Sequence, residues 1–482
     1  MANLKKNLVY NFGLSVSQVL IPFISIPYIA RVLDPDGIGR VSFIDSLAYY
    51  MVVIAEMGLL VYGTRVISRQ RQHSGQLAKT VAELIALHLR ATGVVLLIYG
   101  VAVFLCWQKI QDWRLVLFSL SFVIMNAFAC EWYFRGTESF RYIALRSLFT
   151  RLLGLVSIFI LIKAPSDYFL YYGIIAGSAI LNAAFNWYQL TRLVKISFRT
   201  INWRQHIAQA RFIYYISLTY SITLLLDNVL LRLVSTAAAV GLYAYSAKVV
   251  RISTALITDS LLVFFPRIVA MNEAGTGEAD LVMKRNLQLL IFFAVPLSAG
   301  IFLMAEDIVL VMFGAQFLPA VMNIKILSLF PCIKSLNLFL GNQVLMAGNH
   351  ERAYLRSLLI SGLLFLVLTP LLAHYWADTG ACISLLVAET ITGVLNIMYV
   401  QRLHPAILRR FDGKSLLQAV GVSVLFFPVV YTVNRWVPQP LWQLSAGIVV
   451  CLFLYFSIQF FIAKNTVALL MKDWLQHLLK TA

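Results

Sequence analysis

Residues 7–50 read NLVYNFGLSVSQVLIPFISIPYIARVLDPDGIGRVSFIDSLAYY, and this stretch indicates the class of fold. It holds two apolar runs, near 10–30 and from 41 onward, separated by a charged turn from Arg31 to Arg40. A helix needs about 20 apolar residues to cross the hydrocarbon core of a bilayer. The first run is too long for a signal-peptide core and no small-residue cleavage site follows it. We therefore expect it to stay attached as a membrane-spanning helix.

The composition extends this interpretation to the whole chain. Its 482 residues are 60% apolar and 12% charged, with a mean hydropathy of +0.81. Soluble domains have roughly 45–50% apolar and about 25% charged residues, so a water-soluble fold is excluded. The apolar blocks predict an all-α, polytopic membrane protein of about 14 transmembrane helices. The spans are expected near 10–30, 41–63, 81–105, 115–134, 143–163, 168–190, 212–234, 241–265, 287–305, 323–346, 357–373, 380–401, 416–433 and 441–463.

The basic residues indicate the orientation in the membrane. With the N-terminus inside, most of the 39 Lys and Arg residues fall on the cytoplasmic side, as the positive-inside rule requires. One such basic segment holds Arg135, Arg141 and Arg146. Both termini are therefore predicted to be cytoplasmic. The net charge of +18 follows from this loop-by-loop distribution, so nucleic acid is not an expected partner.

A spaced set of four residues recurs in the two halves of the chain and suggests a duplication. The sets are Arg31, Gly39, Glu56, Arg65 and Arg232, Gly241, Asp259, Arg267. Transporters are often built from two such copies. The duplication predicts two six-helix lobes around a central cavity, followed by two more helices. The expected domains are an N-lobe at 1–204 (helices 1–6), a C-lobe at 205–402 (helices 7–12), and C-terminal helices 13 and 14 with a tail at 403–482.

Several ionisable residues fall within the predicted spans. Such a charge costs roughly 2.5–3.5 kcal/mol on insertion scales, so it usually faces a cavity or a partner. At 100° per residue, Lys248, Arg251 and Asp259 share one stripe of helix eight. Two interpretations stay open: an ion pair of Asp227 with Lys248 or Arg251, or a cationic cavity wall for an anionic substrate.

Three further expectations concern helix ten, the carboxylates within the spans, and the cysteines. Lys334 of helix ten lies deep enough to be a second cavity residue, and Pro331 is expected to kink that helix. Asp259, Glu389 and Asp227 are candidate proton or sodium sites, with structural buried carboxylates as the alternative. The five cysteines show no CxxC pair and no histidine at ligand spacing, so neither a metal nor a cofactor is expected.

Four stretches, in their order and spacing, resemble a known family. They are residues 7–50, EMGLLVYGTRVISRQR (56–71), EWYFRGTESFRYIALRSLF (131–149) and LTYSITLLLDNVLLRLVSTAAAVGLYAYSAKVVRI (218–252). They are similar to the polysaccharide-transporter branch of the multidrug, oligosaccharidyl-lipid and polysaccharide exporter superfamily, whose best-known members are O-antigen-type flippases. The resemblance covers about the whole chain.

Membership would imply two six-helix lobes, alternating access and a polyprenyl-diphosphate-linked oligosaccharide (an O-antigen or exopolysaccharide repeat unit) as the substrate. It would place the protein in the bacterial cytoplasmic (inner) membrane, among membrane lipids. Lys248 and Arg251 suit the implied cavity, with Arg31 nearer its outer rim. The related peptidoglycan-precursor flippases carry an Arg-Asp pair inside helix one. Here that stretch reads FISIPYIA without a charge, which favours a lipid-linked sugar other than lipid II.

Two other classes of function remain as alternatives. A cation-coupled drug exporter of the same superfamily should have a more acidic cavity, which Lys248 and Arg251 argue against. A membrane glycosyltransferase or polymerase generally needs a large extramembrane region, and the predicted loops are short. The DxD pattern of Asp34 and Asp36 is better explained as a proline-stabilised turn, and neither GxxxxGK[ST] nor HExxH occurs. Polymerases and glycosyltransferases of the same pathway would be natural neighbours, although no sequence feature shows contact with them.

Overall fold

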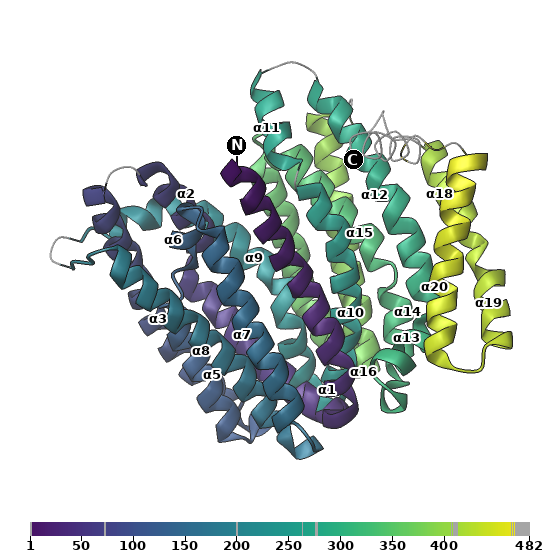
Figure 1. Cartoon of the computed structure of the whole chain (residues 1–482), viewed down its shortest axis with the longest axis horizontal. Helices are drawn as coiled ribbons and strands as arrows, with labels where there is room; N and C mark the ends of the chain where they lie inside the picture. The colour runs from purple at the N-terminus through teal and green to yellow at the C-terminus, as the bar shows by residue number, and fades with distance from the viewer. Residues whose placement is uncertain are drawn as a thin grey trace. The chain divides into compact units, whose positions relative to one another are not determined.

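The computed structural model describes residues 2–71, 74–198, 201–262, 264–274, 278–405, 407, 413–463, 465 and 467. All the regular structure in these ranges is helical (Figure 1). The chain forms two compact units, Met1–Gly241 (unit 1) and Leu242–Ala482 (unit 2). The predicted all-α polytopic membrane fold is confirmed at this level.

Unit 1 contains nine helices within its described residues, and the tenth begins there. They are α1 (Ala2–Glu56), α2 (Leu59–Gln70), α3 (Ser74–Leu105), α4 (Trp107–Ile110), α5 (Trp113–Asn126), α6 (Glu131–Gly136), α7 (Phe140–Leu161), α8 (Tyr168–Leu193), α9 (Arg204–Val234) and the start of α10 (Ala237–Leu262). A short 3₁₀ helix, η1 (Pro165–Asp167), precedes α8.

Unit 2 continues α10 and holds the remaining elements. They are α11 (Phe265–Ala274), α12 (Glu278–Leu303), α13 (Ala305–Met312), η2 (Ala315–Phe317), α14 (Ala320–Leu327), α15 (Phe330–Leu338), η3 (Phe339–Met346), α16 (Glu351–Leu403), α18 (Gly413–Val424), α19 (Phe426–Trp436), α20 (Pro440–Ser457) and η4 (Ile458–Ile462). The predicted kink at Pro331 is present, because the helix breaks between α14 and α15.

In the described part of the chain, eleven helices are long and apolar enough to cross a membrane. Two of these segments, Leu20–Gln70 and Glu351–Leu403, have 51 and 53 residues. At about 1.5 Å per residue, each exceeds twice the bilayer core of about 30 Å. The first breaks at Asp34 (φ 59°, ψ 175°) and the second at Trp376 and Ala377. Each of these segments is therefore long enough for two crossings.

A hydrogen bond within α16 shows that this helix folds back on itself. Thr392 Oγ1 donates to Ser361 Oγ at 2.7 Å, although 31 residues separate the two. In a continuous helix these atoms would be more than 40 Å apart. The two halves of α16 therefore pack side by side as a hairpin.

The outside of the helices is apolar. Leu97, Phe104, Phe453 and Phe461 are each 75–80% exposed and lie on helices of both units. Water-soluble monomers rarely expose contiguous apolar surface of this kind. These side chains are suited to contact lipid chains.

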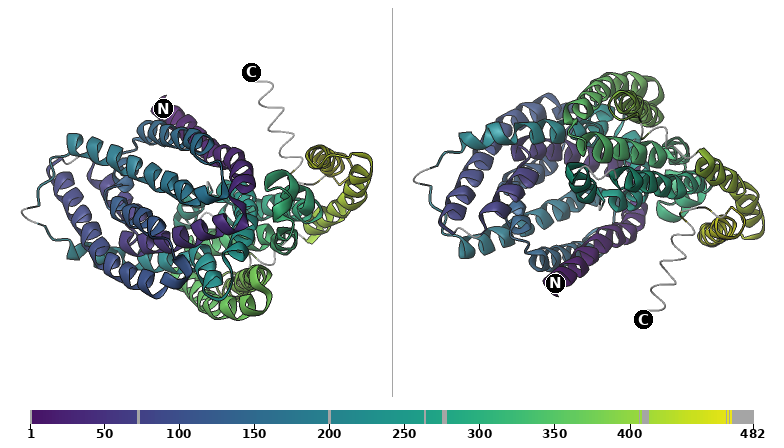
Figure 2. Two further views of the ribbon diagram at one scale, coloured as in Figure 1. Left: turned by 90° about the horizontal axis from the view of Figure 1, so that it is seen from below. Right: turned by 90° about the horizontal axis from the view of Figure 1, so that it is seen from above.

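The last helices of unit 2 are anchored on α12. Phe292 of that helix and Met304, directly after its end, form a buried cluster with Phe426 of α19 and Cys451 and Tyr455 of α20. The Tyr455 hydroxyl also donates to the Phe292 carbonyl at 2.7 Å. Figures 1 and 2 show α18–α20 at the edge of this unit. The two C-terminal helices predicted as an addition to the lobes are thus packed against the body of unit 2.

The backbones of α1 and α10 touch at two glycines. A Cβ atom on Gly39 would lie 1.7 Å from the carbonyl oxygen of Ala237, and one on Gly241 would lie 1.9 Å from that of Pro35. Each glycine thus meets the carbonyl one helical turn before the other glycine. Gly39 and Gly241 are equivalent members of the predicted repeat, so the reciprocal contact supports the duplication. Along the chain, unit 1 ends at residue 241 and unit 2 begins at residue 242. The lobe boundaries at 204 and 402 stay a prediction.

Replacing Gly39 by alanine should strongly destabilise the protein. The new methyl group overlaps the Ala237 carbonyl, so the two helices must separate. Overpacking of this kind typically costs about 1–3 kcal/mol. Thermal unfolding in detergent should show a clear fall in Tm for Gly39→Ala and for Gly241→Ala. Gly100→Ala is the matched control, since nothing lies within 4 Å of its Cβ position. Equal Tm values for Gly39→Ala and the control would contradict the backbone contact.

Candidate functional site

The three charged residues of the predicted stripe lie on α10, which runs without a break from Ala237 to Leu262. Lys248, Arg251 and Asp259 therefore share one side of this helix, as their spacing predicts. Lys248 and Arg251 are partly buried, and Asp259 is exposed. The Lys248 ammonium lies 5.6 Å from the ring centroid of Tyr245, within the range of a cation–π interaction.

Two other predicted residues, Arg31 and Asp227, lie in unit 1. Arg31 is exposed on α1, just before the break at Asp34. Asp227 is completely buried in α9, and its Oδ1 accepts a hydrogen bond from the backbone nitrogen of Asn228 at 2.7 Å. Their roles in substrate binding and ion coupling stay predictions.

Unit 2 brings Lys334 and Glu389 together, which their separation in the sequence did not reveal. The Lys334 ammonium is 2.6 Å from Glu389 Oε1, and the side chains are 13% and 5% exposed. Asn337 Nδ2 donates to Glu389 Oε2 and to its backbone carbonyl, both at 2.8 Å. The two residues were predicted to play separate roles, one in binding substrate and the other in coupling to an ion. The structure shows that their charges compensate each other.

Arg146, predicted to be one of the cytoplasmic basic residues, is buried within a candidate membrane span. Arg146 is on α7, within the candidate span Phe140–Leu161, and is 9% exposed. Its Nη2 donates to Ser147 Oγ at 3.3 Å, whereas Nε and Nη1 have no hydrogen-bond partner among the described residues. The guanidinium carbon also lies 5.8 Å from the Tyr142 ring centroid. Glu131 acts on the guanidinium electrostatically but accepts no hydrogen bond from it, so two donors of this buried cation remain available to an anion.

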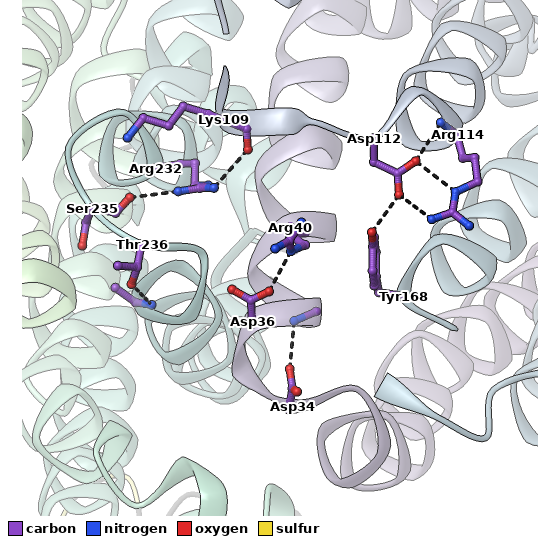
Figure 3. A network of polar contacts seen from close by, with 12 residues as sticks. Asp34, Asp36, Arg40, Lys109, Asp112, Arg114, Tyr168, Arg232, Ser235 and Thr236 are labelled. Atoms are coloured by element: carbon purple, nitrogen blue, oxygen red, sulfur yellow. Dashed lines mark hydrogen bonds and ion pairs between the residues drawn. The ribbon is translucent and has the colours of Figure 1, made fainter. Parts of the chain in front are cut away.

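A network of polar contacts organises one end of unit 1 (Figure 3). At the break in α1, Asp34 Oδ1 accepts from the backbone nitrogen of Gly37 at 2.9 Å. One turn later, Arg40 Nε donates to Asp36 Oδ2 at 2.7 Å. Asp34 has φ 59° and ψ 175°, a strained combination for a residue other than glycine, and the hydrogen bond from Gly37 offsets part of that strain.

The end of α9 is fixed at the same place. Arg232 donates to the carbonyl oxygens of Ser235 and Lys109, both at 3.0 Å. The second bond links α9 to α4, and Asn228 links α9 to α1 by donating to Ser46 Oγ at 2.8 Å. Arg232, the repeat partner of Arg31, thus has a positioning role in unit 1.

Asp112 completes this network between α4 and α5 (Figure 3). Arg114 donates through Nε and Nη2 at 3.0 and 2.9 Å, and the Tyr168 hydroxyl donates at 2.8 Å. Burial would raise the pKa of Asp112, but hydrogen bonds from Arg114 and Tyr168 outweigh it and hold this pKa below its ordinary value. The carboxylate therefore joins α5 to the start of α8.

No group of three or more His, Cys, Asp or Glu side chains in the described ranges is arranged to hold a metal ion.

Comparison with known proteins identifies the family. Residues 4–272 match the model of the family described as "Polysaccharide biosynthesis protein". The chain belongs to this family. Its relatives include proteins named "Putative O-antigen transporter" from Escherichia coli (23% identity over 83% of this chain and 97% of the relative) and Shigella dysenteriae (20% identity, 80% and 98%). The predicted family and the class of membrane transporter rather than enzyme are confirmed.

Solved structures of other proteins share the fold of this chain. The lipid II flippase MurJ in an inward closed conformation aligns over 94% of this chain and 99% of its own, with a TM-score of 0.70 and 13% identity. A multidrug resistance MATE family transporter in an inward-facing conformation aligns over 82% and 99%, with a TM-score of 0.62 and 12% identity. At these identities the likeness establishes a shared fold only.

The Lys334–Glu389 pair gives a test of how the charges of unit 2 are compensated. Glu389→Gln leaves the buried ammonium without its anion, and such a loss costs about 3–5 kcal/mol. Adding Lys334→Met to Glu389→Gln should restore much of the stability, since the glutamine still accepts from Asn337. Thermal unfolding of the two single variants and the double variant measures this coupling. Additive losses would show that the two residues do not interact.

Asp112→Asn should lower the Tm at pH 7, by an amount equivalent to about 1 kcal/mol. Because the pKa of Asp112 is lowered in the folded protein, its stabilisation is present above the unfolded-state pKa and is lost as pH falls through the folded-state value. The difference in Tm should therefore begin to shrink as the pH falls below about 4, and should disappear only below the lower folded-state pKa. Glu138→Gln, at an exposed surface ion pair, is the control and should change the Tm little. A difference independent of pH would contradict a role for the ionised carboxylate.

Proposed function

We propose that this protein is a flippase that moves a polyprenyl-diphosphate-linked oligosaccharide, an O-antigen or exopolysaccharide repeat unit, from the cytoplasmic to the outer leaflet by alternating access. Family membership and the names of the relatives support a role in polysaccharide export. The observation that carries the proposal is Arg146, a buried cation inside a spanning helix with two guanidinium nitrogens that no described residue bonds. Its natural ligand is an anion that enters the membrane.

A diphosphate fits this requirement. Arginine presents a planar fork of donors that matches phosphate oxygens, and charge-assisted hydrogen bonds of this kind are the strong ones. Thr150, one turn beyond Arg146 on α7, donates to Asn182 Oδ1 of α8 at 3.2 Å. Polar groups of two helices thus lie on the same side as the guanidinium and suit a sugar.

The proposed topology has fourteen crossings. Each of the two long broken segments counts twice, and α10 is added to the eleven candidate spans. In this proposal the protein lies in the bacterial cytoplasmic membrane, and both of its termini are cytoplasmic. The break at Asp34 then lies at the outer face, and the starts of α3 and α9 lie at the cytoplasmic face.

The other charges singled out in the sequence have proposed roles in the same transport cycle. Lys248, Arg251 and Arg31 supply cationic surface for the diphosphate. Asp227 and Asp259 are candidates for coupling to a proton or sodium gradient. Glu389 is a candidate only in states where its pair with Lys334 opens. These roles follow the predicted arrangement of a 1–204 N-lobe, a 205–402 C-lobe and two C-terminal helices.

A cation-coupled drug exporter is the second candidate, because the MATE transporter shares this fold. A cationic drug, however, would be repelled by the buried guanidinium of Arg146. The anionic substrate is favoured for that reason.

The test is the leaflet accessibility of lipid-linked oligosaccharide in cells that carry the protein, lack it, or carry a variant at matched membrane abundance. Without the protein, or with Arg146→Gln, the substrate should accumulate on the cytoplasmic side, because the diphosphate loses its buried cation. Arg251→Ala should show a partial loss. Arg141→Gln is the control, since Arg141 lies on the same helix and is exposed.

Two outcomes would count against the proposal. Normal arrival of the substrate in the outer leaflet without this protein, in cells without a redundant flippase, would refute the flippase assignment. Normal transport by folded Arg146→Gln would leave the flippase intact and refute the binding role of Arg146.

A further inference from the structure

A buried titratable cluster in unit 1, apart from the residues discussed so far, joins α2, α3 and the start of α9. At its centre, His206 Nε2 lies 3.0 Å from Glu83 Oε2, with side chains 6% and 2% exposed. The Tyr62 hydroxyl of α2 lies 2.7 Å from His206 Nδ1 and 2.7 Å from Gln209 Oε1. Four side chains from three helices therefore form one continuous hydrogen-bonded chain, in which Tyr62, Glu83 and His206 are buried and Gln209 is exposed.

Glu83 is held as a carboxylate. Its Oε1 accepts from the backbone nitrogen of Asn202 at 3.0 Å, and its Oε2 accepts from Gln205 Nε2 at 3.0 Å. Together with His206 this gives three donors, an arrangement that favours the ionised form. The carboxylate also lies at the N-terminus of α9, where the helix dipole stabilises negative charge. Glu83 is thus prepared to balance a positive charge on His206.

Two arrangements of the hydrogen atoms are compatible with the contacts in this cluster. A tyrosine hydroxyl holds one hydrogen and can also accept one. If Tyr62 donates to Gln209 Oε1, His206 Nδ1–H must donate to Tyr62, and a further proton lies between Nε2 and Glu83. If Tyr62 donates to Nδ1 instead, His206 is neutral, and a flipped Gln209 amide donates to the tyrosine oxygen. Every polar group is satisfied in both, and the two differ by one proton.

We propose that Tyr62, Glu83, His206 and Gln209 form a proton-binding site in which His206 takes up one proton, balanced by Glu83. Histidine ordinarily changes its charge between about pH 5 and 8. Uptake turns the contact with Glu83 into a buried ion pair, and so fastens the start of α9 more firmly to α2 and α3. In the proposed topology this site responds to the pH of the cytoplasm.

The other charged groups described near the cluster are basic, so Glu83 is the anion that His206 faces. Lys79 of α3 acts on Glu83 from one turn away. Arg204, at the start of α9, lies 5.5 Å from the ring centroid of Trp203. Arg90 lies 5.0 Å from the same centroid. Both guanidinium groups are therefore held on the indole rather than on the carboxylate.

The experiment is histidine-selective ¹⁵N NMR of the full-length protein in lipid nanodiscs between pH 5 and 8. The chain has seven histidines, and His206→Gln identifies the signal. The His206 ring should change from neutral to imidazolium as the pH falls. In Glu83→Gln the charged fraction at pH 6.5 should fall at least several-fold. His88 is an internal control: it is buried, and no described group bonds either ring nitrogen, so it should remain neutral.

A second variant and a second readout complete the test. Gln209→Glu keeps the acceptor that Tyr62 needs in the protonated arrangement but removes the donor of the neutral one, so it should raise the charged fraction; it serves if Glu83→Gln does not fold. Hydrogen exchange of the first turns of α9, normalised to intrinsic rates, should be slower at pH 6 than at pH 8 only when His206 is present. The proposal would be overturned by a His206 ring that stays neutral throughout, or by one whose charged fraction changes neither in folded Glu83→Gln nor in Gln209→Glu.

Discussion

The direct contact of two backbones at Gly39 and Gly241 is the constraint on which much of unit 1 depends. No side chain fits between the second half of α1 and the first turn of α10. The chain reaches this contact after α1 breaks at Asp34, whose φ of 59° and ψ of 175° are strained for any residue but glycine, and whose carboxylate accepts from the backbone nitrogen of Gly37. The hydrogen bonds of Asn228 and Arg232 then hold α9 in place beside the contact.

The buried charged residues differ in whether their hydrogen-bonding groups are satisfied within the protein. Lys334 and Glu389 compensate each other, with Asn337 completing the coordination of the carboxylate. Arg146 is also buried, yet two of its nitrogens have no partner among the described residues. In an apolar environment, unsatisfied donors of a buried cation are costly and are tolerated where a ligand can bind them. The anionic lipid-linked substrate proposed above would be such a ligand.

The fold class could be predicted because hydropathy acts locally: each crossing is a run of about 20 apolar residues that can be read without its neighbours. The same holds for the turn at Asp34, the kink at Pro331 and the stripe on α10, which follow from local geometry. Contacts between distant helices left no such signal. The pairing of Lys334 with Glu389 and the cluster of Tyr62, Glu83 and His206 were therefore not predicted. Arg146 was counted with the cytoplasmic basic residues although the predicted span 143–163 contains it, and its burial on α7 could not be derived from the sequence.

The central claim is that this single chain carries a diphosphate-linked sugar across a bilayer. The most direct measurement uses purified protein in liposomes with a polyprenyl-diphosphate-linked oligosaccharide, and follows its accessibility to an added, membrane-impermeant glycosidase. The account predicts that the inner-leaflet fraction becomes accessible only with the protein present, and that excess polyprenyl diphosphate without sugar competes through the shared anion. The account would be contradicted if the protein left this accessibility unchanged, whichever direction of proton or sodium gradient is imposed.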